Sequence, residues 1–504
     1  MNSISYWIHK RADITPDRVA MVGMKEKRTY YDLSQDIYKM ASILKHKLLL
    51  SQGDRVAILS QNREEYMVTY FAIAHLGLIA VPLNIRLSAP ELAFQIKDSG
   101  AKTIIYESET EVLYNDIRNH VNFENAFSFD ESNISKLNLY EEISEVSHLS
   151  SDPFIICYTS GTTGRPKGAV LTQENMYWNA VNNQLAIDIT SADKSIILLP
   201  LFHIGGIGLF AFPTLLAGGT IIIPEKFEPD SAIQTIEDYQ VTIVMGVPAI
   251  HDAIRKSKEF KTANFELVRW FYSGGAPCPE ELINAYIDHG LPFGQGFGMT
   301  ETAPTIFMIS KEDYKRKAGS IGKPVMFTDI SIIDEDGDPV PDGEIGELLI
   351  KGPNVMKEYW DLSDETAKAL RDGWLYSGDL VRRDDEGFIY VAGRKKDMII
   401  SGGENIYPLE IEQVIKELVQ VSETAVIGVQ DEKWGEVPIA FLSFNRNHSV
   451  TSDEVKAYCS SKLGRYKIPK RIIELSELPK NATGKIDKKA LRTIWDRGEI
   501  LHEF

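Results

Sequence analysis

The sequence predicts an α/β protein: a large N-terminal domain of parallel-sheet α/β layers with a small β-barrel-like part, then a small α+β C-terminal domain. At 504 residues the chain is too long for one compact core and should form at least two domains. Strand-like and helix-like segments alternate through its first third, as is typical of parallel sheets covered by helices. After about Lys323, alternating apolar residues and acidic, Gly-rich turns indicate antiparallel hairpins instead.

The alternating region begins with a buried strand near residues 54–60 and a helical segment at 62–77. The next expected elements are a strand at 79–84, a helix at 89–100 and a strand at 101–108. The polar, acidic segment 122–151 is weakly periodic and is expected to be a surface connection. Strand and helix patterns resume at 218–248 and 268–290.

The C-terminal part has a shorter, mixed pattern. It contains a helix at 410–421, strands at 423–431 and 439–445, and a capped helix at 452–464. We therefore place the domain boundary after Gly393, which gives domains of residues 1–393 and 394–504.

Composition excludes several classes. The net charge of −18 argues against a general nucleic-acid binder, which needs excess Lys and Arg. The cysteines Cys157, Cys278 and Cys459 are far apart and form no CxxC pair, so neither a disulfide framework nor a zinc site is indicated. A reducing cytoplasm fits this usage, and the N-terminus has no signal-peptide pattern.

One apolar run, Ile196–Pro224, is long enough to span a bilayer and contains no Asp, Glu, Lys or Arg. Pro200, Pro213 and two Gly pairs interrupt it. This pattern favours a buried strand–loop–helix–strand over a membrane span.

A Gly-, Thr- and Ser-rich stretch, YTSGTTGRPKG at residues 158–168, follows an apolar run. Glycines let the main chain approach an anion and turn its N–H groups toward it. Hydroxyl side chains can donate to phosphate oxygens, and Lys167 supplies a positive charge. The stretch departs from the GxxxxGK[ST] pattern because Gly168 follows Lys167. It predicts a phosphate loop, with a simple surface turn as the alternative.

Further motifs follow in a set order: GFGMTE at 296–301, YSGD at 376–379, GRKKD at 393–397, SGGENIYPLEIE at 401–412 and NATGKIDKKALR at 481–492. With the phosphate loop, they resemble the adenylate-forming superfamily of acyl-CoA synthetases, adenylation domains and luciferases, most of all bacterial fatty-acid CoA ligases. The resemblance covers nearly the whole chain. It implies ATP and Mg²⁺ as cofactors, CoA as co-substrate, and an acyl-adenylate as intermediate.

The resemblance assigns a nucleotide site. Its expected ATP- or AMP-binding residues are Thr159, Ser160, Gly161, Thr162, Thr163, Gly164, Lys167, Gly275, Ala276, Gly296, Phe297, Gly298, Thr300, Asp379 and Arg394. Phe297 stands where the family commonly has Tyr. Thr300 would contact the α-phosphate, and Asp379 with Arg394 would bind the ribose. Glu301, counted among the catalytic residues, would hold Mg²⁺, which prefers oxygen ligands. Taken alone, Glu301 reads as a solvated loop acid and Asp379 as a turn residue.

The C-terminal motifs imply further roles. Lys485 would be the catalytic lysine that stabilises charge during adenylation, although alone it reads as one of several exposed lysines. Lys396 would be the hinge of a mobile C-terminal domain. Gly402 and Gly403 would line the CoA route with Trp434, for which ordinary burial is the alternative.

The acid pocket is expected after the phosphate loop. His203 stands where amino-acid-activating relatives carry an Asp, so an amino-acid substrate is disfavoured, and we count His203 among the catalytic residues. A core histidine satisfied by the backbone is the alternative. The expected pocket lining is Val247, Ile250, Gly274 and Met299. Apolar lining suits an alkyl chain and also accepts a flat aryl acid.

The leading hypothesis is an AMP-forming ligase that joins a medium- or long-chain fatty acid to CoA. An aryl-acid (benzoate-type) CoA ligase and an enzyme that loads a carrier protein are the alternatives. A non-catalytic nucleotide-binding protein and a membrane transporter are rivals from other classes. The expected partners are a small carboxylic acid, ATP and CoA, with no nucleic acid and no integral membrane segment. Peripheral contact with lipid and a homodimer stay open.

Overall fold

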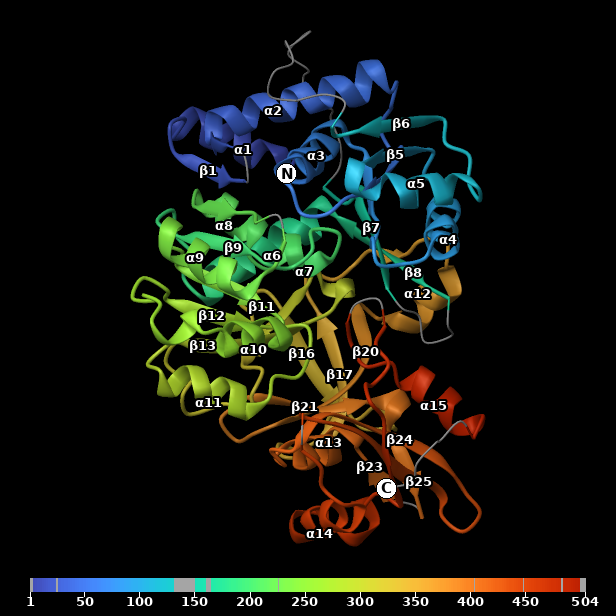
Figure 1. Cartoon of the computed structure of the whole chain (residues 1–504). Helices are drawn as coiled ribbons and strands as arrows, with labels where there is room; N and C mark the ends of the chain where they lie inside the picture. The colour runs from blue at the N-terminus through green and yellow to red at the C-terminus, as the bar shows by residue number, and fades with distance from the viewer. Residues whose placement is uncertain are drawn as a thin grey trace. The chain divides into compact units, whose positions relative to one another are not determined.

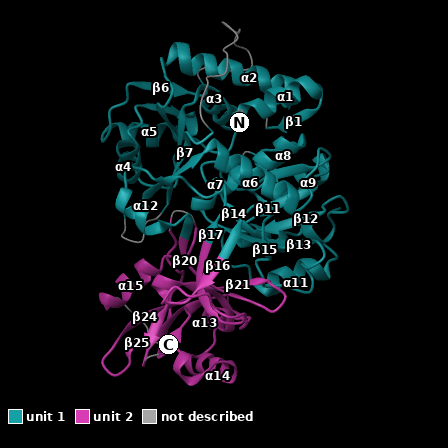
Figure 2. Cartoon of the chain, turned by 180° about the vertical axis from the view of Figure 1, so that it is seen from behind, with its two compact units in different colours: residues 1–330, 350–375 teal, residues 331–349, 376–504 magenta. Residues whose placement is uncertain are grey.

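The computed structural model describes residues 3–23, 26–130, 150–159, 165–224, 226–402, 404–446, 448–481 and 484–498 (Figure 1). The chain divides into two compact units (Figure 2). Unit 1 comprises Met1–Ile330 and Ile350–Leu375, and unit 2 comprises Ser331–Leu349 and Tyr376–Phe504. The predicted domain boundary after Gly393 and the predicted hinge at Lys396 fall inside unit 2 and stay predictions.

Unit 1 contains two mixed sheets. The nine-stranded sheet has the order β15 (Lys323–Pro324), β14 (Thr305–Met308), β13 (Phe293–Gly298), β12 (Trp270–Ser273), β11 (Ile243–Gly246), β9 (Lys194–Ile197), β10 (Thr220–Ile222), β1 (Val19–Val22) and β2 (Lys27–Thr29). Its central strands are parallel, and antiparallel pairs occur only toward its two edges. The predicted parallel core is confirmed.

The second sheet of unit 1 carries the predicted phosphate loop. Its order is β18 (Glu358–Tyr359), β8 (Lys167–Thr172), β7 (Pro153–Thr159), β4 (Ile79–Pro82), β3 (Arg55–Leu59), β5 (Thr103–Tyr106) and β6 (Asn125–Ser128). Strands β6, β5, β3, β4 and β7 run parallel, whereas β8 and β18 run antiparallel to their neighbours. β6 lies within the predicted surface connection 122–151, so that prediction was wrong for these residues. β6 pairs with β5. Its four residues are too few to show the alternating apolar pattern by which a strand is predicted from sequence.

Helices cover these sheets. They are α1 (Ser5–Ile14), α2 (Tyr30–Ser42), the π-helix η1 (Ile43–Lys47), α3 (Glu64–Leu76), α4 (Ala89–Ser99), α5 (Glu111–Arg118), α6 (Gln173–Ala186), α7 (Ile204–Gly208), α8 (Ala211–Ala217), α9 (Pro229–Tyr239), α10 (Pro248–Lys256), α11 (Glu280–Asp288) and α12 (Ser363–Ala369), with 3₁₀ turns η2 (Ser108–Thr110), η4 (Glu259–Lys261) and η5 (Thr300–Thr302). α4 begins at a capping box in which Ser88 and Glu91 satisfy each other's backbone N–H groups. The helices predicted at 62–77 and 89–100 are thus confirmed as α3 and α4.

The apolar run Ile196–Pro224 folds within unit 1 as the end of β9, then α7, α8 and β10. Its large apolar side chains, such as Phe210 and Phe212, are buried. This confirms the predicted strand–loop–helix–strand. No helix within the described ranges combines the length and apolar character that crossing a bilayer requires.

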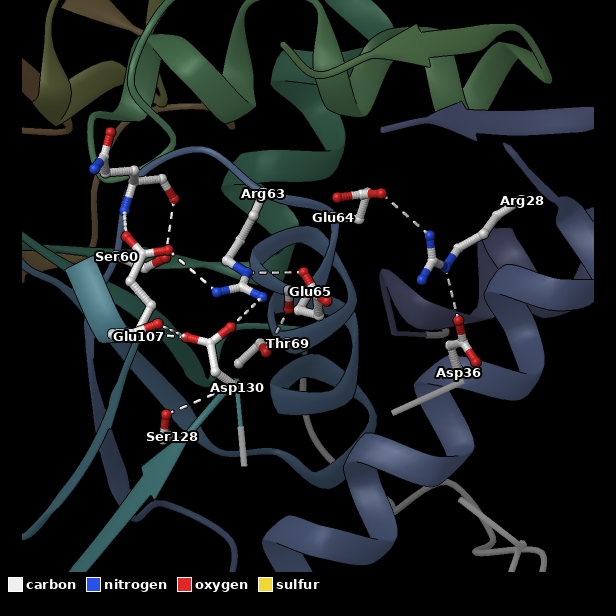
Figure 3. Close-up of polar contacts among 12 residues, drawn as sticks. Arg28, Asp36, Ser60, Arg63, Glu64, Glu65, Thr69, Glu107, Ser128 and Asp130 are labelled. Atoms are coloured by element: carbon white, nitrogen blue, oxygen red, sulfur yellow. Dashed lines mark hydrogen bonds and ion pairs between the residues drawn. The ribbon is translucent and has the colours of Figure 1, made fainter. Parts of the chain in front are cut away.

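An ion-pair network fixes the start of α3 (Figure 3). Arg63, just before the helix, contacts Glu65 at 2.8 Å, Glu107 at 3.2 Å and Asp130 at 3.1 Å. The neighbouring Asn62 amide donates to Leu199 O at 2.9 Å, and its Oδ1 accepts from Leu201 N at 2.7 Å. Asn62 therefore holds the segment Leu199–Leu201, which leads into His203, beside the start of α3.

Unit 2 contains antiparallel strands and a small α+β part. A five-stranded sheet, most of whose residues belong to unit 2, has the order β16 (Asp329–Ile333), β17 (Ile345–Lys351), β20 (Trp374–Arg383) and β19 (Leu370–Arg371), with β21 (Ile389–Arg394) beside β20; the residues of β19 belong to unit 1. The predicted antiparallel pattern is confirmed where β20 pairs with β19 and with β21.

The second sheet of unit 2 has the order β23 (Glu404–Ile406), β22 (Ile399–Ser401), β25 (Gly435–Phe444) and β24 (Val421–Asp431), with β26 (Arg471–Glu474) beside β25. Its helices are α13 (Pro408–Lys416), α14 (Ser452–Lys462) and α15 (Lys488–Asp496), with 3₁₀ turns η6 (Lys395–Asp397) and η7 (Arg465–Lys467). Apolar side chains of α13 and α14 pack on the sheet.

Candidate active site

The predicted phosphate loop joins β7 and β8 as a hairpin. Thr159 and Lys167 stand opposite each other where the two strands meet the loop. Both therefore lie at the mouth of the hairpin. The predicted phosphate-binding residues Ser160, Gly161, Thr162, Thr163 and Gly164 lie outside the described residues.

A segment far along the chain reinforces this hairpin. β18 pairs with β8 and places Tyr359 opposite Ala169, and Trp360 N donates to Gly168 O at 2.7 Å. The Tyr359 N–H in turn donates to Thr366 Oγ1 at 2.9 Å, which ties α12 to the strand. Helix α12 thereby carries Glu365 onto Lys167, whose ammonium it contacts.

Glu301 occupies η5, directly after β13. It is buried, its carbonyl accepts from Met356 N at 2.7 Å, and its Oε1 accepts from the Tyr359 hydroxyl at 2.8 Å. Lys167 Nζ lies 5.1 Å from the centroid of the same Tyr359 ring. One tyrosine thus contacts both the predicted magnesium ligand and the predicted phosphate-binding lysine.

The GFGMTE motif forms the end of β13 and the start of η5. Gly296, Phe297 and Gly298 pair with Met308, Phe307 and Thr305 of β14, and the Phe297 and Phe307 rings lie 6.2 Å apart. Met299 and Thr300 follow and are half-buried. The motif is therefore held by strand pairing on one side and by the Glu301 contacts at its end.

The predicted pocket residues meet beside β11. Val247 and Ile250 pack with buried Met245 and Tyr272 in one apolar cluster. A Cβ placed on Gly274 would lie 3.1 Å from Met245 Cε. Gly275 and Ala276 follow and are exposed. Val247, Ile250 and Gly274 thus lie near the ends of β11 and β12, while Met299 follows β13; that they line an acid pocket stays a prediction.

His203 caps α7. Its Nδ1 accepts from the Gly205 N–H at 3.1 Å, and the side chain is half-buried. A ring nitrogen that accepts a hydrogen bond is unprotonated, which assigns the proton of the neutral ring to Nε2. The backbone contact that the core-histidine alternative expects is therefore present. This hydrogen bond does not test the catalytic role that we predict for His203, which stays a prediction.

In unit 2, Asp379 and Arg394 face each other across β20 and β21, with Arg394 Nε donating to Asp379 Oδ1 at 2.9 Å. The Asp379 side chain is 4% exposed and that of Arg394 is 51% exposed. Ser377 Oγ accepts from Asp379 N at 3.1 Å. Asp379 is thus held by hydrogen bonds through both its main-chain N–H and its buried carboxylate.

Lys485 lies in a tight loop before α15. Asn481 N donates to Lys485 O at 2.8 Å, and Lys485 N donates to Asn481 Oδ1 at 3.0 Å. Lys485 keeps exposed surface. Partial desolvation and the positive charge of Arg394 lower the pKa of its side chain, and the negative charge of Asp379 acts in the opposite direction. Asp379, Arg394 and Lys485 thus all lie in unit 2, and the charges of the first two act on the Lys485 ammonium in opposite directions.

The predicted CoA-route residues also meet in unit 2. Gly402 N donates to Trp434 O at 2.7 Å, and Trp434 is 42% exposed. The ordinary explanation of a fully buried Trp is therefore wrong here. Gly403 lies outside the described residues, and Lys396 is an exposed residue of η6.

Sequence reasoning missed Tyr359 and Glu365. The segment 358–366 lies outside the motifs that carry the family resemblance, and strand β18 is only two residues long. An aromatic pair followed by acidic residues, EYWDLSDE, was the available signal. It carries no chemistry until β18 pairs with β8.

A magnesium ion fits Glu301 only with help from the nucleotide. Among the described residues no group of three or more His, Cys, Asp or Glu side chains is arranged to hold a metal. A single buried carboxylate suits a Mg²⁺ ion that takes its other ligands from phosphate oxygens and water.

Comparison with known proteins identifies the family. Residues 8–360 match the AMP-binding enzyme family, and residues 410–485 match the C-terminal domain of AMP-binding enzymes. The chain is 39% identical to a feruloyl-CoA synthase of an Amycolatopsis species over 96% of this chain and 98% of that protein. It is 37% identical to a long-chain-fatty-acid–CoA ligase of Mycobacterium tuberculosis over 98% of both chains.

A solved structure agrees. The o-succinylbenzoate coenzyme A synthetase of Bacillus subtilis, in complex with ATP and a magnesium ion, matches with a TM-score of 0.88 and 35% identity over 96% of this chain and 99% of that one. The chain therefore belongs to the AMP-binding enzyme family, within the adenylate-forming superfamily, and is an enzyme of the acid–thiol ligase class.

Proposed function

We propose that the chain joins a medium- or long-chain fatty acid to CoA, using ATP and Mg²⁺, through an acyl-adenylate. One observation carries the proposal: a phosphate-loop cation, Lys167, and a buried carboxylate, Glu301, are linked through Tyr359 in unit 1. The same unit holds the apolar cluster around Val247 and Ile250. The relatives that match nearly the full length are named as ligases or synthases of CoA esters.

The first step needs no general base. A carboxylic acid is ionised at pH 7, so its oxygen can attack the α-phosphorus directly, with pyrophosphate as the leaving group. The obstacle is repulsion between the carboxylate and the polyphosphate. We assign Thr159 and Lys167 to the phosphates, Thr300 to the α-phosphate, and Lys485 to the charge that develops between the reactants. Mg²⁺ held by Glu301 would supply further charge neutralisation.

The remaining nucleotide contacts follow from the motif positions. We assign Phe297 to the adenine face and the Asp379 carboxylate to the ribose hydroxyls, because a carboxylate can accept from both hydroxyls of a diol. In the second step the CoA thiol attacks the acyl carbon and releases AMP. Gly402 and Trp434 are proposed to line the thiol's approach, and a rotation about Lys396 is proposed to separate the steps.

Apolar lining supports the choice of acid. Met245 and Ile250 present hydrocarbon surface, and no acidic residue stands at the His203 position to bind a substrate ammonium group. An aryl acid is the second candidate. The feruloyl-CoA synthase match and the aromatic Tyr272 within the cluster favour it.

The deciding experiment is a panel of fatty acids of graded chain length and of aromatic acids, with pyrophosphate and AMP release measured with and without CoA. A fatty-acid ligase releases AMP in a CoA-dependent manner with alkyl acids and is slow with rings. An aryl-acid ligase gives the reverse order. Release that requires a carrier protein instead of CoA would replace both candidates. A cytoplasmic location stays a prediction.

A further inference from the structure

Two side chains that no sequence motif singled out contact the predicted phosphate-binding lysine from different directions. Tyr359 presents its ring to Lys167, and Glu365 contacts the same ammonium with a carboxylate oxygen. The Lys167 side chain is 14% exposed. Both residues come from one segment, 358–366, whose backbone pairs with β8, and Met356 N just before it donates to Glu301 O of η5 at 2.7 Å.

Tyr359 also contacts the predicted magnesium ligand. Its hydroxyl donates to Glu301 Oε1 at 2.8 Å, and the tyrosine is 9% exposed. A hydrogen bond to a charged group in such a buried place restricts the carboxylate to one orientation. The tyrosine hydroxyl and the tyrosine ring thereby act on two different groups of the site.

Glu365 is itself held on both carboxylate oxygens. One contacts Lys167, and the other accepts from Lys368 Nζ at 2.7 Å. These two lysines lower the pKa of Glu365 to about 2, so the carboxylate is ionised at neutral pH. A lysine side chain loses considerable rotamer freedom when it is ordered. Because the Glu365 carboxylate is fixed beside Lys167, the lysine side chain is already ordered in the folded chain.

We propose that Tyr359 and Glu365 are positioning residues for adenylation: Glu365 holds the Lys167 ammonium at the mouth of the phosphate loop, and Tyr359 orients the Glu301 carboxylate toward the nucleotide-bound magnesium. The proposal rests on the proposed function. Neither residue is assigned a contact with substrate; each acts through its charged partner.

The test measures ATP binding to the full-length chain by titration calorimetry over a range of Mg²⁺ concentrations. In Y359F the ring stays over Lys167 while the hydroxyl is lost. We expect the Mg²⁺ concentration needed for half-maximal ATP binding to rise about tenfold, because one hydrogen bond to a charged group is removed. In E365Q we expect ATP binding at saturating Mg²⁺ to weaken about tenfold.

Matched controls separate this effect from general damage. D364N removes an exposed carboxylate from the same helix. Y286F removes a buried hydroxyl that donates to His251 O at 2.8 Å. Both should bind ATP like the parent chain. In a K167Q background, E365Q should cause no further loss, since its effect passes through Lys167. If E365Q does not fold, E365D keeps the charge at shorter reach and should show an intermediate loss.

The outcomes decide the proposal either way. Unchanged ATP binding in folded Y359F and E365Q overturns it, and so does tighter binding in E365Q, which would mean that Glu365 competes with the nucleotide for Lys167. Additive losses in K167Q/E365Q would reduce Glu365 to a general structural role. If the parent chain binds ATP but releases no pyrophosphate with any acid, the proposed function fails while ATP binding still decides the positioning roles. If the parent chain binds no ATP, both fail.

Discussion

Arg394 and Asp379 stand in register on neighbouring antiparallel strands, and Arg394 Nε donates to Asp379 Oδ1 at 2.9 Å. The carboxylate is buried, while the guanidinium is half-exposed. A buried charge is costly unless it is paired, so Arg394 stabilises an ionised Asp379 in this place. Two residues that lie fifteen positions apart in the sequence thus form one unit, through the β20–β21 hairpin.

Asp379→Asn should weaken nucleotide binding. The amide keeps the shape but can accept through only one oxygen, and it leaves Arg394 without its ionic partner. We expect KM for ATP to rise by about 10- to 100-fold, the equivalent of a lost hydrogen bond to a charged group. Asp385→Asn, an exposed carboxylate in the same hairpin turn, is the control. Normal KM in D379N would rule out the assigned ribose contact.

Lys485→Ala should separate the two half-reactions. Adenylation brings a carboxylate to a polyphosphate, whereas CoA attack on an acyl-adenylate involves no such encounter. We therefore expect pyrophosphate release to fall by roughly 10²- to 10³-fold, while CoA ester formation from supplied acyl-adenylate continues. Lys489→Ala removes an exposed lysine nearby as control. Equal loss in both half-reactions would show that Lys485 supports the fold or the whole site instead.

The pH dependence of adenylation provides a second measurement on Lys485. Desolvation and the charge of Arg394 lower its pKa below the ordinary 10.5, so the ammonium loses its proton at a lower pH than a free lysine does. The charged form is the one that the mechanism needs. The pyrophosphate-release rate should therefore decline on the alkaline side before an ordinary lysine would titrate, and K485R should move this decline to higher pH.

Stability should fall on acidification because of His251. This buried ring donates Nε2–H to Tyr272 O at 2.9 Å, and burial lowers its pKa from 6.5 to about 4. Between these values the unfolded chain binds more protons, so the stabilisation is complete above pH 6.5 and is lost as the pH falls toward 4. The maximum contribution is about 3 kcal/mol for a shift of this size.

Urea unfolding of unit 1 at pH 7.5 and pH 5 would measure this effect. In His251→Gln the difference between the two pH values should shrink, and in the exposed His289→Gln it should stay as in the parent chain. His9, whose pKa is also lowered to about 4 by burial, accounts for part of the remaining difference. An undiminished pH effect in H251Q would contradict the assignment.

Long, periodic elements were predictable from the sequence because their patterns are local. The helix at 62–77 has a continuous apolar pattern and became α3, and the apolar run Ile196–Pro224 was correctly interpreted from its Pro and Gly residues. The strand Asn125–Ser128 was missed. It is four residues long and depends on pairing with β5, which is a tertiary effect.

The site was predictable where a motif carries it. Glu301, Asp379 and Lys167 were predicted from their neighbours in sequence, and their roles stay predictions. Tyr359 and Glu365 were not, because they approach Lys167 only when a strand nearly two hundred residues later pairs with β8. Such a contact has no local pattern, and the one signal in the sequence, EYWDLSDE, indicates no chemistry until β18 pairs with β8.

Gly402→Ala should impair the CoA step alone. Gly402 has φ +61°, which favours glycine, and a Cβ there would lie 2.8 Å from Trp434 Cε3. The added methyl group must therefore push the exposed indole or the loop that carries it. We expect slower CoA ester formation from supplied acyl-adenylate, by about tenfold for a strain of one to two kcal/mol, with pyrophosphate release unchanged.

Gly337→Ala tests the backbone strain alone, because Gly337 has φ +92° and no heavy atom within 4 Å of an added Cβ. If G402A slowed pyrophosphate release as much as ester formation, the loop would belong to the adenylation step, and the proposed CoA route past Trp434 would be wrong.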